Sequence, residues 1–138
     1  MRISRRDTLR LGLGAGAALT VLSHEGALAQ QGPQTVTFLL TNDIYEMNEE
    51  KGRGGFPKLA AIVKAEKAKS PNVVFVHGGD TLSPSLMSGF TQGAHMIDLF
   101  NALPPDALVP GNHEFDFGKD AFLKRMGESK FPWVAANI

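Results

Sequence analysis

The strongest indication of the fold of this chain is the sequence Val73-Val74-Phe75-Val76-His77-Gly78-Gly79-Asp80 (VVFVHGGD). Residues 73–77 form a short and almost wholly apolar run, which predicts a strand that is buried on both faces. Two glycines and an aspartate follow at once, so the strand ends in a turn that carries a carboxylate. Strands of this kind occur in parallel sheets covered by helices, where ligands bind at the carboxyl ends of the strands.

Helices and strands alternate on both sides of this stretch. Upstream, residues 35–41 (TVTFLLT) are β-branched and apolar, which predicts a strand. Residues 56–69 repeat apolar side chains at helical spacing, with Pro57 in the first turn. Downstream we expect a loop over 78–92, a helix over 93–103, a strand over 107–110, a helix over 118–129 and a strand over 132–136. The order β-α-β-α-β-α-β predicts an α/β fold with a mostly parallel sheet.

Residues 1–29 predict a cleavable export signal rather than a part of the fold. A basic segment, Met1–Arg10, precedes an apolar run over 11–22, and Ala27-Leu28-Ala29 has the small-x-small form of a cleavage site. Residues 4–9 (SRRDTL) resemble a twin-arginine signal, which predicts passage through the twin-arginine export machinery and a periplasmic or secreted protein. The apolar run is too short and too rich in glycine for a stable membrane span.

The remaining residues divide into a linker over 30–34 and one domain over 35–138. The chain has 138 residues and no net charge, and it contains no cysteine. Disulfide frameworks and thiolate metal sites are therefore excluded. Lysine and arginine do not cluster as a nucleic-acid surface requires, so we expect no nucleic-acid polymer as a partner.

Three predicted strand ends each carry side chains that can bind a metal ion. Thr41-Asn42-Asp43 follows the first strand, Gly79-Asp80 the second, and Gly111-Asn112-His113-Glu114-Phe115-Asp116 (GNHEFD) the third. Carboxylate, amide and imidazole groups suit manganese, zinc, iron or magnesium ions. Two such ions can lower the pKa of a shared water and clamp a phosphoryl oxygen. His113 and Asp116 are three residues apart and can form an imidazole–carboxylate pair.

These motifs resemble those of the calcineurin-like metallophosphoesterases, in particular the bacterial periplasmic 5′-nucleotidase branch. The resemblance also includes Gly54-Gly55 before the first helix and Ala136-Asn137-Ile138 at the end. It implies a four-layer α/β/β/α sandwich, of which residues 35–138 form the incomplete N-terminal portion. The resemblance further implies that the substrate is a small-molecule phosphoester, namely a nucleotide. The attacking group would be a hydroxide that two divalent metal ions activate.

The resemblance also implies a role for each matching residue. Asp43 is a ligand of the first metal ion, Asp80 bridges both ions, and Asn112 binds the second. His113 and Asp116 form the catalytic dyad. The residues that bind the rest of the substrate are not identified by these motifs.

The chain departs from the family pattern at the first strand end, where Asp-x-His is replaced by Asp43-Ile44-Tyr45. A neutral phenol is a poor ligand for zinc or manganese. Three interpretations follow: Tyr45 points away and leaves a weakened first site, Tyr45 coordinates as phenolate and favours a ferric-type ion, or His77 takes the ligand position.

The second departure is the missing set of later histidine ligands, because residues 117–138 contain no histidine. We therefore expect the chain as given to be an inactive fragment of a longer enzyme. One alternative is a non-catalytic exported binding protein. Another is a hydrolase of cyclic nucleotides, nucleotide sugars or thiosulfate groups.

Overall fold

The structure is a computed structural model that describes residues 35–136. The export signal and the linker predicted over 1–34 lie outside the described residues, as does the pair Asn137 and Ile138. Between residues 35 and 136, no helix has the length and apolar character needed to cross a bilayer.

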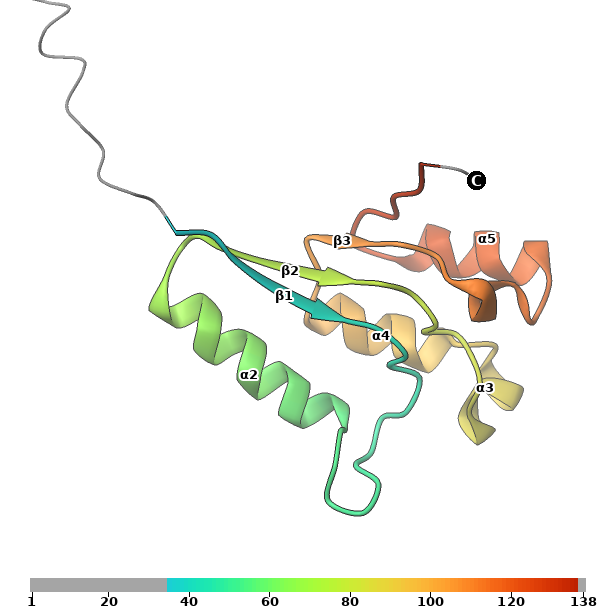
Figure 1. Cartoon of the computed structure of the whole chain (residues 1–138). Helices are drawn as coiled ribbons and strands as arrows, with labels where there is room; N and C mark the ends of the chain where they lie inside the picture. Colours follow the sequence, from blue (N-terminus) through green and yellow to red (C-terminus); the bar gives the residue numbers. More distant parts are fainter. Residues whose placement is uncertain (1–34, 137–138) are drawn as a thin grey trace, which may run out of the picture. The chain divides into compact units, whose positions relative to one another are not determined.

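Three parallel strands form the sheet, in the spatial order β1-β2-β3 (Figure 1). β1 (Thr37–Thr41) pairs along its whole length with β2 (Val73–His77), so that Thr41 lies opposite His77. β3 is the short pair Ala107–Leu108, at the other edge of β2. Because all three strands run in the same direction, their carboxyl ends meet at one edge of the sheet. This confirms the predicted parallel arrangement.

The strand predicted over 132–136 does not form, and the strand predicted over 107–110 ends early. Trp133 makes a single isolated parallel bridge with Leu108. Leu108 N donates to the Pro132 carbonyl at 3.0 Å, and Val134 N donates to the Leu108 carbonyl at 2.8 Å. Pro110 and Pro132 have no N–H group to continue a ladder. The prediction of a fourth strand was therefore wrong. Within residues 35–136, segment 132–136 makes only the single bridge between Trp133 and Leu108.

Three helices lie where the sequence predicts them, and a fourth lies in the predicted loop. α2 (Phe56–Lys69), α4 (Ala94–Ala102) and α5 (Lys119–Glu128) are confirmed within one residue at each end. The predicted loop over 78–92 contains α3 (Leu86–Thr91). A helix of six residues is too short to show a periodic apolar stripe, which is why the sequence did not reveal it.

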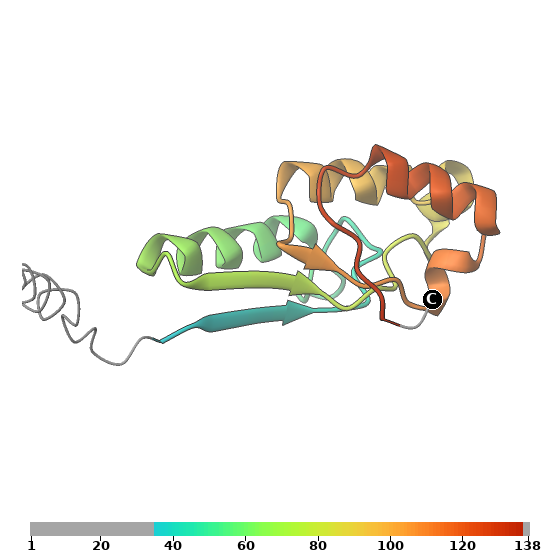
Figure 2. The same ribbon diagram turned by 90° about the horizontal axis from the view of Figure 1, so that it is seen from above.

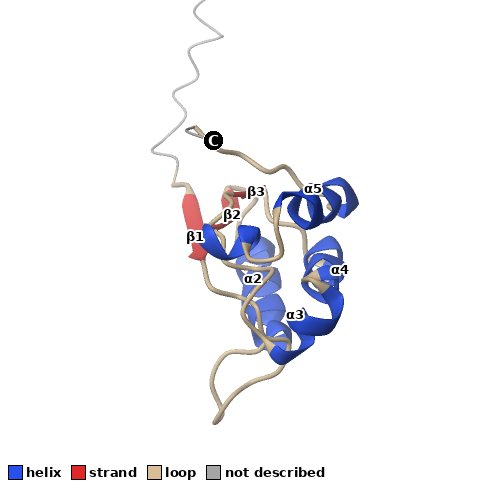
Figure 3. Cartoon of the chain, turned by 90° about the vertical axis from the view of Figure 1, so that its right-hand side faces the viewer, coloured by secondary structure: helices blue, strands red, loops and turns tan. Residues whose placement is uncertain are grey.

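The helices gather on one side of the strands (Figure 3). Phe75 of β2 and Phe100 of α4 are fully buried between the two layers, and the ring of Phe56 packs edge-on against Phe100 at 5.2 Å between ring centroids. The other face of β1 is uncovered within the described residues: Phe38 is 70% exposed and Leu40 is 69% exposed. The described part thus supplies one helix layer and one sheet layer of the implied α/β/β/α sandwich.

Candidate active site

Two backbone hydrogen bonds bring the first two strand ends together beyond the sheet. Gly78 N donates to the Thr41 carbonyl at 2.7 Å, and Asp43 N donates to the Gly79 carbonyl at 3.0 Å. Asp43 and Asp80 both have left-handed backbone angles, with φ of 57° and 59°. Aspartate adopts this conformation more readily than most residues. The chain therefore turns sharply at both carboxylates, side by side at the edge of the sheet.

The third strand end approaches Asp80 very closely. His113 N donates to Asp80 Oδ1 at 3.0 Å. A Cβ atom built on Gly111 would lie 2.3 Å from the same Oδ1, and one built on Gly79 would lie 2.4 Å from Gly111 N. Both glycines are therefore needed, because any side chain would push the Asp80 loop and the GNHEFD loop apart.

Glu114 joins these two loops through its carboxylate, which is completely buried. Oε1 accepts from Thr81 N at 2.6 Å and from Leu82 N at 3.3 Å. Oε2 accepts from Asp80 N at 2.9 Å and from Gly111 N at 2.6 Å. Sequence reasoning did not single out this residue. Its signal was the capping-box spacing from Gly111 to Glu114, where an acidic side chain returns to the first N–H of the turn.

The predicted pair of His113 and Asp116 is formed. His113 is the second residue of a short 3₁₀ turn (η1, Asn112–Phe115), and its Nδ1 lies 2.7 Å from Asp116 Oδ2. Ser83 Oγ donates to the same Oδ2 at 2.6 Å. The hydrogen bond to Asp116 raises the pKa of His113. The hydrogen bond from Ser83, followed by that from His113, lowers the pKa of Asp116.

His77 is a buried link between strand ends, and its interpretation as a replacement metal ligand stays a prediction. Its Nδ1 lies 2.9 Å from Thr41 Oγ1 and its Nε2 lies 2.6 Å from Thr81 Oγ1. Both ring nitrogens are thus engaged, and the ring packs against Phe100. Burial lowers the pKa of His77 to about 4, and the nearby charges of Asp43 and Asp80 offset only part of that effect.

Tyr45 is half-buried in the loop that follows β1. Its backbone lies beside His95, where burial lowers the pKa of the imidazole and the Tyr45 backbone opposes that shift. His95 Nδ1 lies 2.7 Å from Thr91 Oγ1. The choice between Tyr45 pointing away and Tyr45 binding as phenolate stays a prediction.

The donors at the sheet edge fit a hard divalent cation in part. Asp43 and Asn112 are exposed and Asp80 is half-buried, so their oxygen atoms can reach a bound ion. Within residues 35–136, no three His, Asp or Glu side chains gather closely enough to form a ligand cluster by themselves. Two carboxylates and one amide therefore supply only part of a coordination sphere.

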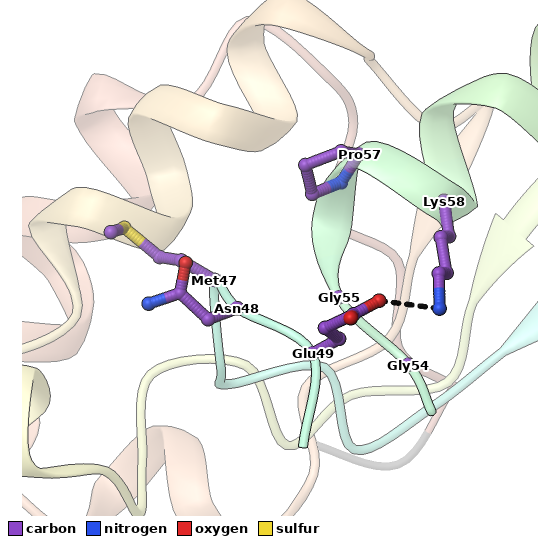
Figure 4. A pocket seen from close by; sticks show the side chains of 7 residues that line it. All are labelled: Met47, Asn48, Glu49, Gly54, Gly55, Pro57 and Lys58. Atoms are coloured by element: carbon purple, nitrogen blue, oxygen red, sulfur yellow. Dashed lines mark ion pairs between the residues drawn. The ribbon is translucent and has the colours of Figure 1, made fainter. Parts of the chain in front are cut away.

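The hollow at the start of α2 is separate from this site (Figure 4). Its volume is about 220 Å³, and Glu49 and Lys58 form an ion pair at its rim. None of the predicted site residues lines it. The candidate site is instead the edge of the sheet at the carboxyl ends of the strands, whose arrows all point the same way in the view from above (Figure 2).

Residues 36–138 match the family of calcineurin-like phosphoesterases. The chain therefore belongs to that family, as its motifs predict. Enzymes of this family use divalent metal ions, which agrees with the oxygen donors at the strand ends.

Among its relatives, a human 5′-nucleotidase is 31% identical over 139 aligned positions, which cover 90% of this chain and 24% of the human protein. A snake venom 5′-nucleotidase from Naja atra is 29% identical over 119 positions, covering 78% of this chain and 22% of that protein. The chain thus spans about a quarter of the length of these curated relatives.

Solved structures agree on the fold. A Haemophilus influenzae NAD nucleotidase superposes with a TM-score of 0.68 and 26% identity, over 74% of this chain and 20% of that one. A calcineurin-like phosphoesterase from Bacillus subtilis, YfkN, superposes with a TM-score of 0.64 over 72% of this chain and 36% of that one. At 23% identity, the second similarity supports the fold alone.

Proposed function

We propose that the protein is an exported, metal-dependent hydrolase that removes phosphate from nucleotides. The observation that carries the proposal is the position of His113. Its backbone is hydrogen-bonded to Asp80, a candidate metal ligand, while its ring is hydrogen-bonded to Asp116. These two contacts support the proposal that the imidazole acts beside a metal-bound phosphoryl group.

Each residue has a defined part in this proposal. Asp43, Asp80 and Asn112 would hold two divalent ions, which supply an activated water and neutralise charge on the phosphoryl oxygens. Asp116 occupies Nδ1 of His113, so Nε2 is the nitrogen that would act on the substrate. The hydrogen bond to Asp116 raises the pKa of His113 from its ordinary value. His113 can therefore stabilise developing charge or protonate the leaving oxygen.

The choice of a nucleotide is supported by the relatives, whose names are 5′-nucleotidase and NAD nucleotidase. Export is supported by the twin-arginine pattern in residues 4–9 and the cleavage-site pattern at 27–29. A fusion of residues 1–34 to a reporter that is active only outside the cytoplasm tests the export step. Replacing Arg5 and Arg6 by lysine should block export if the twin-arginine route is used.

Phosphate release tests the enzymatic proposal. The complete gene product is supplied in turn with manganese, zinc, iron and magnesium, and is offered nucleoside 5′-monophosphates, cyclic nucleotides, nucleotide sugars and a thiosulfate ester. We expect the fastest release from the 5′-monophosphates. His113→Ala should depress turnover far more than metal content, and an equal loss of both would contradict the assigned role.

A second function is favoured by Tyr45, which stands where the family pattern has histidine. A weakened first metal site would leave an exported protein that binds phosphorylated ligands without hydrolysing them. In the same experiment, nucleotide binding without phosphate release under all four metal ions would establish this alternative.

A further inference from the structure

The hydroxyl of Ser83 contacts the His113–Asp116 pair from a different strand end. We propose that Ser83 is a positioning residue, which fixes the Asp116 carboxylate and through it the orientation of the His113 ring. The consequence for catalysis rests on the function proposed above, whereas the consequence for ring orientation does not. Ser83 belongs to none of the motifs that connect this chain to its family.

The geometry joins three side chains through one oxygen atom. Ser83 Oγ lies 2.6 Å from Asp116 Oδ2, and His113 Nδ1 lies 2.7 Å from the same atom. The Asp116 side chain is otherwise partly exposed to solvent, at 38%. An exposed carboxylate at the end of a short turn has several accessible rotamers. The bond from Ser83 selects the rotamer in which Oδ2 meets the imidazole.

Ser83 can act as an anchor because its own position is rigid. The residue is only 4% exposed. On one side, Thr81 N and Leu82 N are held by the buried Glu114 carboxylate. Leu82 is also confined by Gly93, where an added Cβ would lie 2.6 Å from Leu82 Cδ2.

The segment after Ser83 leads into α3 and makes its own hydrogen bonds. Ser85 caps α3 by accepting from Ser88 N at 3.0 Å, and the hydroxyls of these two serines lie 2.7 Å apart. The cap thus bonds within α3 only, whereas the backbone before Ser83 is fixed by the Glu114 carboxylate. Ser85 provides a matched control, because it lies two residues away and bonds to α3 rather than to Asp116.

Proton NMR of the full chain without metal or substrate tests the positioning role. The Nδ1–H resonance of His113 is observable only while Asp116 protects that proton from exchange with water. We expect Ser83→Ala to broaden the resonance beyond detection, as Asp116→Asn should. We expect Ser83→Thr, which keeps the hydroxyl, and Ser85→Ala to retain it. Thermal unfolding of each variant confirms that the measured protein is folded.

Kinetics of the complete gene product provide the second measurement. Ser83→Ala should lower kcat about 10-fold with KM changed less than about 2-fold, because the lost bond orients a group that acts in the transition state. Ser83→Thr should restore kcat, and Ser85→Ala should leave both constants unchanged.

An unchanged His113 resonance in folded Ser83→Ala protein would overturn the inference. An equal loss of kcat in Ser85→Ala would overturn it as well, because the effect would then come from α3. If the unmodified protein releases no phosphate while the resonance depends on Ser83, the positioning role stands and the proposed function fails.

Discussion

At the scale of single residues, the edge of the sheet is organised by side chains that make several hydrogen bonds each. Glu114 accepts four backbone N–H groups from two loops that are distant in sequence. His77 joins two threonines in the same way. Glu114 and His77 thus fix the loops at the strand ends. The residues proposed to act on substrate lie in these loops.

Replacing Glu114 by glutamine should destabilise the fold. The glutamine amide keeps one acceptor oxygen, but its NH₂ group replaces the other. Two of the four backbone N–H groups then lose their acceptor and face another donor. We expect the free energy of unfolding to fall by about 2–4 kcal/mol, measured by urea denaturation. Glu66→Gln is the control, because Glu66 makes only a surface ion pair with Lys69 and should change stability by less than about 1 kcal/mol. Equal effects of the two substitutions would contradict a stabilising role for the four hydrogen bonds to Glu114.

His77 should make stability depend on pH. Its pKa is about 4 in the folded protein and 6.5 in the unfolded chain, so only the unfolded state takes up a proton between these values. Stability should be full above pH 6.5 and should fall as the pH decreases toward 4, by about 3 kcal/mol in total. Urea denaturation at several pH values measures this slope. His77→Asn cannot titrate in this range, so a slope that survives the substitution would assign the effect to other groups.

At the scale of secondary-structure elements, helices tolerate changes that the strand ends do not. Gly111 and Gly79 are confined by neighbouring backbone and carboxylate atoms, whereas nothing lies within 4 Å of a Cβ atom built on Gly127 of α5. Glycine in a helix is unfavourable because it loses more backbone freedom on folding than alanine does.

Gly127→Ala should therefore stabilise the protein by about 0.5–1 kcal/mol. Gly111→Ala is the opposing comparison, because its Cβ would meet Asp80 Oδ1 and force the two loops apart. We expect that substitution to lower the midpoint of thermal unfolding while Gly127→Ala raises it. If Gly111→Ala stabilised the protein, the two loops would have space for a Cβ atom, and the predicted clash with Asp80 Oδ1 would be contradicted.

At the scale of the whole described unit, residues 35–136, one face of the sheet lacks a cover. Phe38 and Leu40 of β1 point away from the helices and are mostly exposed, and Val36 before them is 52% exposed. Contiguous exposed apolar side chains on a sheet promote association with other surfaces. The opposite face, with Phe75 at its centre, is fully packed.

Phe38→Lys should lower self-association of the 138-residue chain without loss of folding. Since the side chain is 70% exposed, we expect the free energy of unfolding to change by less than about 1 kcal/mol. Phe75→Ala, by contrast, should cost about 3–5 kcal/mol because it leaves a cavity in the core. Light scattering at increasing protein concentration measures association. If the Phe38→Lys variant self-associates as strongly as the unmodified chain, the associating surface does not include Phe38.

Local patterns were sufficient for much of this molecule. The helical spacing of apolar residues predicted α2 with correct bounds, and the short, continuously apolar run at 73–77 predicted β2. The polar residues after each strand predicted the location of the candidate site, because parallel strands end at one edge. The pairing of His113 with Asp116 follows from their separation of three residues within one turn.

The side chains that support that site could not be predicted from local sequence patterns. Ser83 and Asp116 are 33 residues apart, and Thr41 and His77 are 36 apart, so no local pattern connects them. The early end of β3 and the single bridge at Trp133 likewise depend on how two proline-containing segments meet. Sequence alone determined the elements and the chemical groups at their ends, since both depend on near neighbours. The supporting contacts depend on three-dimensional packing, which brings distant segments within hydrogen-bonding distance.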